Sequence, residues 1–154
     1  MTNNELDTFL DNLQDEILRD AHNAYGEKGY DRWLNPSYRH ILDNPDCQAK
    51  LTGECGDSME MYLKIDPHKQ IVTEASYQTS GCASSSICGS IAAELVRGKP
   101  VMDVLDMRGE DILRELGKFP KDEEHCAHLA ITTVKEAIHN YMRQTVKKTD
   151  KEPE

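Results

Sequence analysis

A change of hydrophobic period at Ser58 limits this chain to folds that contain antiparallel strands. Between Ser58 and Ile65, apolar residues alternate with more polar ones, which is typical of a strand with one buried face. A turn sequence follows at 66–69, and residues 71–79 are rich in β-branched side chains, as a returning strand would be. The segment 58–79 therefore predicts a β-hairpin.

Helical spacing dominates the chain after the hairpin. The predicted helices are one that begins after Cys82 and closes at Gly98, two short ones around 101–106 and 111–116, and a last one from about 121 to 146. Before the hairpin, the stretch between turns at 35–36 and 43–46 is expected to be irregular or a short strand. This order of elements predicts an α+β fold, with a small antiparallel β-sheet packed against helices on one face.

The first segment predicts an added N-terminal amphipathic helix. Its apolar residues recur at spacings of three and four, and they are Leu6, Leu10, Leu13, Ile17 and Ala21. We expect this helix to pack on the core or to serve in oligomerisation, with its acidic face in solvent. The expected organisation is an N-terminal helical extension at 1–30, one folded domain at 31–147 and a disordered charged tail at 148–154.

The charge balance narrows the classes of partner. The 154 residues include 18 Lys and Arg against 28 Asp and Glu, a net charge of −10, which would repel the phosphates of a nucleic acid. A cation or a basic protein fits this charge better. No apolar stretch approaches the roughly 20 residues that span a bilayer, and the acidic opening sequence is unlike a signal peptide. We expect a cytoplasmic protein with neither nucleic acid nor membrane as its partner.

Five cysteines raise the prospect of thiol chemistry. An odd number without a secretion signal disfavours a disulfide framework. Cys55 stands between glycines before the first clear strand, and Cys82 and Cys126 stand at the starts of predicted helices, where the thiolate is favoured. Spacing alone leaves metal binding and simple burial about equally supported.

Two further side chains accompany these thiols. Asp57 follows Cys55 by two residues, so that both would face one side of an extended segment. His125 is adjacent to Cys126 and could share a metal with it only at a helix end. Cys47 is expected to be a spare surface or half-buried thiol. Cys88 lies about 240° around the helix from Cys82, which predicts that it belongs to the core.

Four segments resemble a known family when they are taken in order. They are NPSYRHILDNP, GECGDSMEMYLKID, TSGCASSSICGSIAAELVRGK and EEHCAHLA. Together they resemble the U-type iron–sulfur cluster assembly scaffold, which is the IscU family and also the N-terminal domain of NifU. The resemblance covers residues 35–143. It implies the α+β fold and a function: building a transient 2Fe–2S cluster from iron and persulfide sulfur and transferring it to acceptor proteins.

The resemblance also assigns roles to particular residues. It implies that Cys55, Cys82 and Cys126 ligate the cluster, and that Cys126 accepts persulfide sulfur from a cysteine desulfurase. It implies that Asp57 tunes cluster lability and can ligate metal, and that His125 can provide an alternative ligand. Soft thiolates with a harder fourth ligand suit a cluster that must be released. Which of Asp57 and His125 is the fourth ligand is left open.

The resemblance leaves alternatives open as well. The Leu-Pro-Pro-Val-Lys segment that a dedicated chaperone binds in the bacterial IscU branch is replaced here by residues 118–122, so we do not expect that chaperone to recognise this chain. His125 and the lack of an insertion before it favour the IscU branch over the SufU branch. Zinc suits the same ligands, so a zinc-binding structural or regulatory protein is the principal alternative, and a thiol-dependent enzyme centred on Cys126 is a weaker one. Expected partners are a desulfurase, iron or electron donor proteins and apo acceptor proteins, with homo-oligomerisation undetermined.

Overall fold

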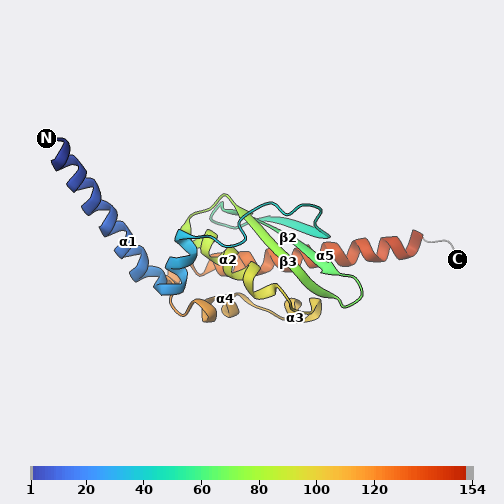
Figure 1. The fold of residues 1–154 in the computed structure, drawn as a ribbon. Helices are drawn as coiled ribbons and strands as arrows, with labels where there is room; N and C mark the ends of the chain where they lie inside the picture. Colours follow the sequence, from blue (N-terminus) through green and yellow to red (C-terminus); the bar gives the residue numbers. More distant parts are fainter. Residues whose placement is uncertain (1, 152–154) are drawn as a thin grey trace.

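The computed structural model of the chain describes residues 2–151 and has the expected α+β fold (Figure 1). Along the chain, its elements are α1 (Asn3–Leu34), β1 (Cys47–Thr52), β2 (Ser58–Asp66), β3 (Ile71–Thr79), α2 (Ala83–Val96), α3 (Val101–Leu105), α4 (Gly109–Leu116), the 3-10 turn η1 (Lys121–Glu123) and α5 (His125–Lys151). The hairpin, the helix after Cys82 and the two short helices are confirmed. No helix in this part of the chain is long and apolar enough to cross a membrane.

The sheet contains a strand that the sequence did not predict. Its three strands are antiparallel in the order β1-β2-β3, with Cys47 opposite Leu63 and Met61 opposite Tyr77. Cys47 and Ala49 point inward from β1 and are buried. The expectation that Cys47 is a surface or half-buried thiol is therefore wrong, because its position on the inner face of β1 leaves it only 3% exposed.

Helices α2 and α5 cover the apolar face of the sheet, and the core lies between them and the strands. Cys88 is completely buried on α2, as predicted. Gly89 allows α2 to approach β3, because a Cβ at this position would lie 2.4 Å from a ring carbon of Tyr77. The Tyr77 hydroxyl donates to the Ser86 carbonyl oxygen at 2.8 Å, and this hydrogen bond holds the buried ring against the helix.

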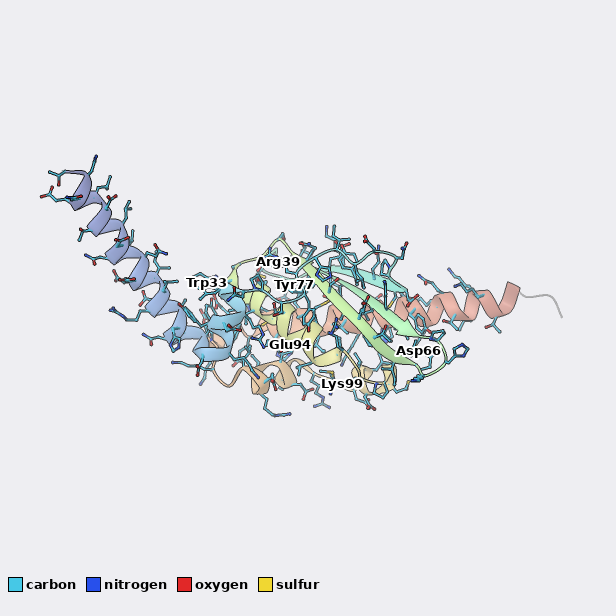
Figure 2. The ribbon with its side chains drawn as sticks, in the orientation of Figure 1. Trp33, Arg39, Asp66, Tyr77, Glu94 and Lys99 are labelled. Atoms are coloured by element: carbon cyan, nitrogen blue, oxygen red, sulfur yellow. The ribbon has the colours of Figure 1, made fainter. Side chains whose placement is uncertain are left out.

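Irregular segments cover the outer edge of β3 at both of its ends. The Tyr77 amide donates to the Tyr38 carbonyl oxygen at 3.0 Å, and the Val72 amide donates to the Lys99 carbonyl oxygen at 2.9 Å. Figure 2 labels Arg39 and Tyr77 together near one end of this strand, where the Arg39 guanidinium donates to the Thr79 carbonyl oxygen at 3.1 Å. Both ends of the strand edge are thus hydrogen-bonded within the chain.

Helix α1 bends sharply at Gly26, which has φ +72° and ψ −178°, a conformation that essentially only glycine adopts. Beyond the bend, the helix is fixed to the domain: Arg32 forms two hydrogen bonds with Glu94, at 2.8 and 2.7 Å, and Gly29 is buried. Before the bend, residues 3–25, here called the arm, lead away from the rest of the molecule (Figure 1), and Tyr25 at the base of the arm still contacts the domain. Of the two expectations for this segment, core packing is wrong, since Leu6, Leu10 and Leu13 remain exposed.

The last helix differs from its expected limits at both ends. Residues 121–123 form the separate turn η1, and α5 begins at His125. At its other end α5 continues to Lys151, so residues 148–151 are helical where a disordered tail was expected. The remaining tail, 152–154, lies outside the described residues. The α5 helix therefore extends beyond the sheet at the end of the molecule opposite the arm (Figure 1).

Candidate metal centre

The three cysteines predicted as ligands lie at the ends of helices and strands. Cys55 lies in the turn between β1 and β2, Cys82 is the N-cap residue of α2, and Cys126 lies in the first turn of α5. Cys55 and Cys82 are exposed, whereas Cys126 is 1% exposed. The Gly53 amide donates to the Asp57 carbonyl oxygen at 2.8 Å and so closes the turn around Cys55. All five cysteines of the chain are free thiols.

A short chain of contacts that includes a serine connects three of the predicted site residues. The Ser85 hydroxyl donates to Asp57 Oδ2 at 2.9 Å and lies 3.5 Å from Cys126 Sγ. The other neighbour of that carboxylate oxygen is Cys82 Sγ, at 4.0 Å. Because a Cβ at Gly81 would lie 2.7 Å from Asp57 Oδ2, only glycine leaves room for this arrangement. The structure thus brings Asp57, Cys82 and Cys126 to one place.

The other two predicted residues line a cavity of about 800 Å³ between the β1–β2 turn and the start of α5. Cys55 contributes to one wall of the cavity, and His125, His128 and Leu129 contribute to another. Cys126 is close enough for the charges of Cys82, Cys55 and Asp57 to raise the pKa of its thiol. The five predicted residues therefore belong to one region of the molecule.

Burial is the main influence on the pKa of the Cys126 thiol. Desolvation raises the pKa of this thiol to about 11, and only the Ser85 hydroxyl opposes the change by favouring the thiolate. Burial likewise raises the pKa of the core thiols Cys47, to about 12, and Cys88. A thiol with a raised pKa is protonated and weakly nucleophilic at neutral pH. Cys126 is therefore chemically unlike the two exposed cysteines of the site.

The kinds of ligand in this region suit a thiophilic metal, although their side chains do not converge on a single metal position in this structure. Among residues 2–151, no three His, Cys, Asp or Glu side chains are gathered closely enough to hold a metal ion. Three thiols with a carboxylate and an imidazole are nevertheless the ligands that iron–sulfur centres and zinc prefer. Cys55 stands on a turn with Gly56 at φ +88°, and the Cys82 side chain is exposed. Both of these side chains are accessible for binding.

Sequence reasoning missed several residues of this region. Ser85 was not among the predicted site residues, yet it forms the link between Asp57 and Cys126. Ser84 accepts or donates a hydrogen bond with the Tyr25 hydroxyl at 3.0 Å and donates to Glu123. No periodic signal marks such contacts, because the partners are separated by 28 to 59 residues along the chain.

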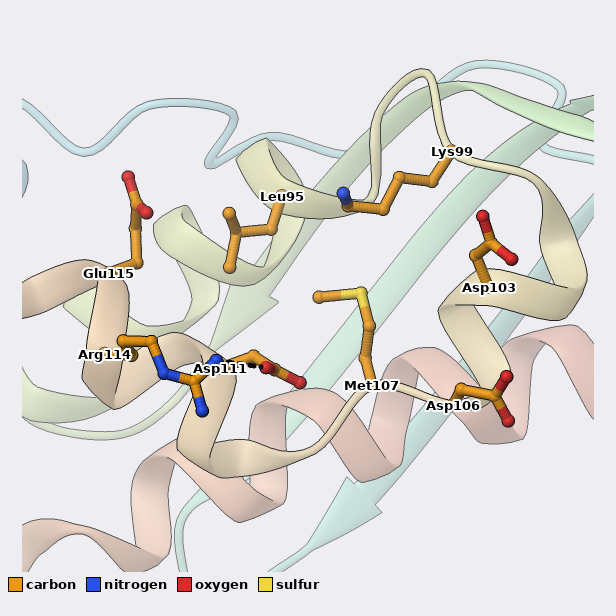
Figure 3. A pocket seen from close by; sticks show the side chains of 8 residues that line it. All are labelled: Leu95, Lys99, Asp103, Asp106, Met107, Asp111, Arg114 and Glu115. Atoms are coloured by element: carbon orange, nitrogen blue, oxygen red, sulfur yellow. Dashed lines mark hydrogen bonds and ion pairs between the residues drawn. The ribbon is translucent and has the colours of Figure 1, made fainter.

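A second cavity lies away from the thiols. It has a volume of about 330 Å³ and is lined by residues of α2, α3, α4 and their connections, shown in Figure 3: Leu95, Lys99, Asp103, Asp106, Met107, Asp111, Arg114 and Glu115. Arg114 forms an ion pair with Asp111 at 3.1 Å on the same helix. No cysteine or histidine lines this cavity, so we place the candidate metal centre at the thiols.

The raised pKa of Cys126 predicts an order of thiol reactivity. At pH 8, iodoacetamide should alkylate Cys55 and Cys82 quickly and Cys126 slowly, since Cys126 is both buried and protonated. Between pH 8 and pH 10 the rate at Cys126 should rise about tenfold per pH unit, because well below the pKa the thiolate fraction rises by that factor. Peptide mass spectrometry of timed samples measures each site, with the buried Cys88 as the internal control. Equal rates at Cys126 and Cys82 at pH 8 would contradict the structure.

Fold and site together define a class of protein: an α+β domain that presents thiols, a carboxylate and an imidazole at the ends of its elements. Comparison with known sequences identifies the family within this class. The NifU-like N terminal domain family matches residues 24–148, and the chain belongs to this family. A relative from Aquifex aeolicus, the iron-sulfur cluster assembly scaffold protein IscU, is 32% identical over 119 residues, which cover 77% of this chain and 76% of the relative. Iron-sulfur cluster assembly protein 3 of Arabidopsis thaliana is 36% identical over 115 residues, which cover 72% of this chain and 66% of the relative.

Solved structures share the fold. The N-terminal part of a NifU-like protein from Brucella abortus superposes with a TM-score of 0.61 at 20% identity, covering 79% of this chain and 96% of that one. A SUF-system scaffold from Fervidobacterium islandicum AW-1 gives a TM-score of 0.58 at 18% identity, covering 77% and 98%. These similarities support the fold, and the family assignment rests on the sequence matches.

Proposed function

We propose that this protein is a scaffold on which an iron–sulfur cluster is assembled and from which the cluster passes to acceptor proteins. The observation that carries the proposal is the chain of contacts from Cys82 through Asp57 and Ser85 to Cys126, next to the exposed Cys55. The family assignment and relatives with the names of iron–sulfur cluster assembly proteins support it. The zinc-binding alternative is not favoured by these relatives, although the same donors suit zinc.

The proposed ligands are the thiolates of Cys55, Cys82 and Cys126, with Asp57 or His125 as the fourth. The two exposed cysteines can bind iron without opening the core, whereas Cys126 must move outward from the first turn of α5. A carboxylate is a harder ligand than a thiolate and holds an iron–sulfur cluster less tightly. A ligand set that includes Asp57 therefore suits an iron–sulfur cluster that is to be released to an acceptor protein.

Sulfur would arrive as the terminal sulfur of a persulfide on a cysteine desulfurase. In the proposed transfer, the sulfur of Cys126 bonds to that terminal sulfur, the bond between the two donor sulfurs breaks, and the donor regains its thiol with the proton from Cys126. Cys126 is left as a persulfide, and the exchange involves no net oxidation. Because Cys126 is buried, this step requires the start of α5 to open when the donor docks.

Assembly of a 2Fe–2S cluster also needs electrons. Reducing two persulfide sulfurs to sulfide takes four electrons, and oxidation of two ferrous ions to ferric ions supplies two of them. An electron donor protein must supply the other two. The proposed partners are therefore a desulfurase, iron and electron donor proteins, and apo acceptor proteins, and the scaffold itself turns over no substrate. A cytoplasmic location, suggested by five free cysteines, remains part of the proposal.

Anaerobic reconstitution tests the proposal. The purified chain is incubated with ferrous iron, cysteine, a reductant and a cysteine desulfurase, and its visible absorption and metal content are recorded. The scaffold function predicts sulfur-to-iron charge-transfer bands, together with two irons and two sulfides per cluster, and transfer of the cluster to an added apo-ferredoxin. A colourless protein that retains one zinc per chain through the same treatment would support the zinc alternative instead.

Replacing Asp57 tests its proposed role in cluster release. We expect Asp57→Ala to retain its cluster several times longer in air than the natural protein, because a labile carboxylate ligand and its link through Ser85 are both lost. Decay of the charge-transfer absorption gives the lifetime. Glu60→Ala, which removes a carboxylate from the neighbouring strand β2, is the control and should leave the lifetime unchanged. Equal or faster decay in Asp57→Ala would contradict this role.

A further inference from the structure

The arm, residues 3–25, lies almost entirely outside the part of the chain that matches the family, which begins at residue 24. It is nevertheless a well-formed helix. Thr2 and Glu5 form a capping box at its start, with hydrogen bonds of 2.8 and 3.3 Å between the side chain of each residue and the backbone amide of the other. A helix of 23 residues extends roughly 35 Å from the bend at Gly26. Such a helix needs an explanation other than cluster assembly.

Five large apolar side chains form one exposed stripe along the arm, here called the apolar stripe: Leu6, Phe9, Leu10, Leu13 and Ile17, with exposures of 44%, 56%, 50%, 43% and 51%. At about 100° per residue, they fall within a sector roughly 100° wide. Most of the other exposed large apolar residues of the chain are scattered. A continuous apolar stripe on a projecting helix is typical of an association surface.

The spacing of the apolar stripe is complementary to itself. Leu6, Leu10, Leu13 and Ile17 are separated by four, three and four residues, and the series is the same in either direction. An antiparallel copy can therefore place Leu6 opposite Ile17, and Leu10 opposite Leu13, in successive layers. Asp20 then lies opposite Asn3 at the ends of the pair, outside the apolar layers.

Charge is compatible with this pairing although the arm is acidic. Six carboxylates against Arg19 give the arm a net charge of −5. In the antiparallel register, the residues that flank the stripe would place Asp7 opposite Gln14 and Glu16 opposite Phe9 of the second copy. Asp11 and Asp15 point away from the pair. No flanking carboxylate therefore faces another carboxylate, whereas an anionic lipid surface would meet the full negative charge of the arm.

We propose that the arm binds the arm of a second copy of this chain, antiparallel, through the apolar stripe. We choose a second copy of this chain as the partner because the spacing of the stripe is self-complementary and because no carboxylate beside the stripe would face another carboxylate. Five apolar side chains per copy form a small interface, so the expected dissociation constant is on the order of 10 µM. Because the arm projects away from the domain (Figure 1), pairing through the apolar stripe would leave the exposed Cys55 and Cys82 of both copies uncovered. The proposal does not depend on the proposed function.

Sedimentation equilibrium of the full chain tests the pairing. At 100 µM protein, the mass should approach twice the 17.5 kDa of one chain, and it should fall toward 17.5 kDa at 1 µM. Leu10→Glu with Leu13→Glu places charges in the central layers and should weaken association at least tenfold. Thr8→Glu with Asn12→Glu adds the same charges away from the stripe and should have a much smaller effect. Circular dichroism establishes that both variants remain helical.

Two further measurements separate this pairing from other occupants. Gln14→Lys would face Asp7 of the second copy and should tighten association more than Asn12→Lys, which makes the same charge change away from the interface. Raising the salt from 0.05 to 0.5 M should preserve or strengthen association, since it screens the repulsion between two acidic chains. A monomer at 100 µM would overturn the proposal, and so would equal masses for the stripe variant and its control. Equal effects of the two lysine substitutions would overturn the antiparallel register.

Discussion

Replacing Cys82 with alanine should abolish formation of a stable cluster. In anaerobic reconstitution, the Cys82→Ala variant should develop less than about a tenth of the charge-transfer absorption of the natural protein. Cys82 is exposed, it is the N-cap residue of α2 and its Sγ lies 4.0 Å from Asp57 Oδ2, so its thiolate is placed to bind on that side of the site. Loss of one of three soft ligands leaves a set that holds iron poorly.

The matched control for this variant is Cys88→Ala on the same helix. Cys88 is completely buried in the core, so its replacement should cost about 1 kcal/mol of folding stability for the small cavity and leave the chromophore intact. Circular dichroism establishes that both variants are folded. Full absorption in Cys82→Ala, or its loss in Cys88→Ala alone, would contradict the assignment of the site.

The second large effect concerns the fold itself. We expect Gly89→Ala to lower the free energy of unfolding by about 3 kcal/mol, because the added Cβ would lie 2.4 Å from the ring of Tyr77, which is buried and hydrogen-bonded to α2. In a chain of this size, that corresponds to a fall in the melting temperature of roughly 6–12 °C. Thermal denaturation followed by circular dichroism measures the change.

Gly53→Ala provides the comparison for that experiment. A Cβ at Gly53 would lie 3.4 Å from the nearest side-chain carbon, on Leu129, which is ordinary packing distance. Its melting temperature should therefore change by no more than about 3 °C. If Gly89→Ala were as stable as Gly53→Ala, the close approach of α2 to β3 in this structure would be incorrect.

Local patterns in the sequence were sufficient to predict most elements of the fold. The alternation between Ser58 and Ile65 and the helical spacing after Cys82 both reflect burial of one face, which leaves a periodic signal. The strand Cys47–Thr52 was missed, although Cys47, Ala49 and Leu51 alternate with polar residues. Small side chains such as cysteine and alanine give a weak strand signal, and in this case contact with α5 stabilises the strand.

The site could be predicted only in part. The resemblance identified Cys55, Cys82 and Cys126, which the structure places in one region, but not the connection between them. Ser85 links Asp57 to Cys126 because the β1–β2 turn, α2 and α5 converge, and convergence of distant segments is a tertiary property. The burial of Cys126 likewise depends on packing, which the spacing of cysteines along a chain does not report.

The arm shows a different limit of sequence patterns. The apolar spacing correctly predicted a helix with one apolar face. It could not distinguish a face buried in the core from a face left exposed, because both give the same pattern. The bend at Gly26 decides between them in this chain, since it directs residues 3–25 away from the domain.

The hydrogen bonds along the outer edge of β3 have a consequence for the protein in a crowded solution. An unprotected strand edge is a template for adding strands from other chains, which leads to aggregation. Here Tyr38 and Lys99 already accept hydrogen bonds from Tyr77 and Val72, and on the far side of the sheet the Asn140 side chain donates to the Gln48 carbonyl oxygen of β1 at 2.9 Å. Because both ends of the β3 edge are already hydrogen-bonded within the chain, this edge should resist strand addition even during the opening that we propose at the start of α5.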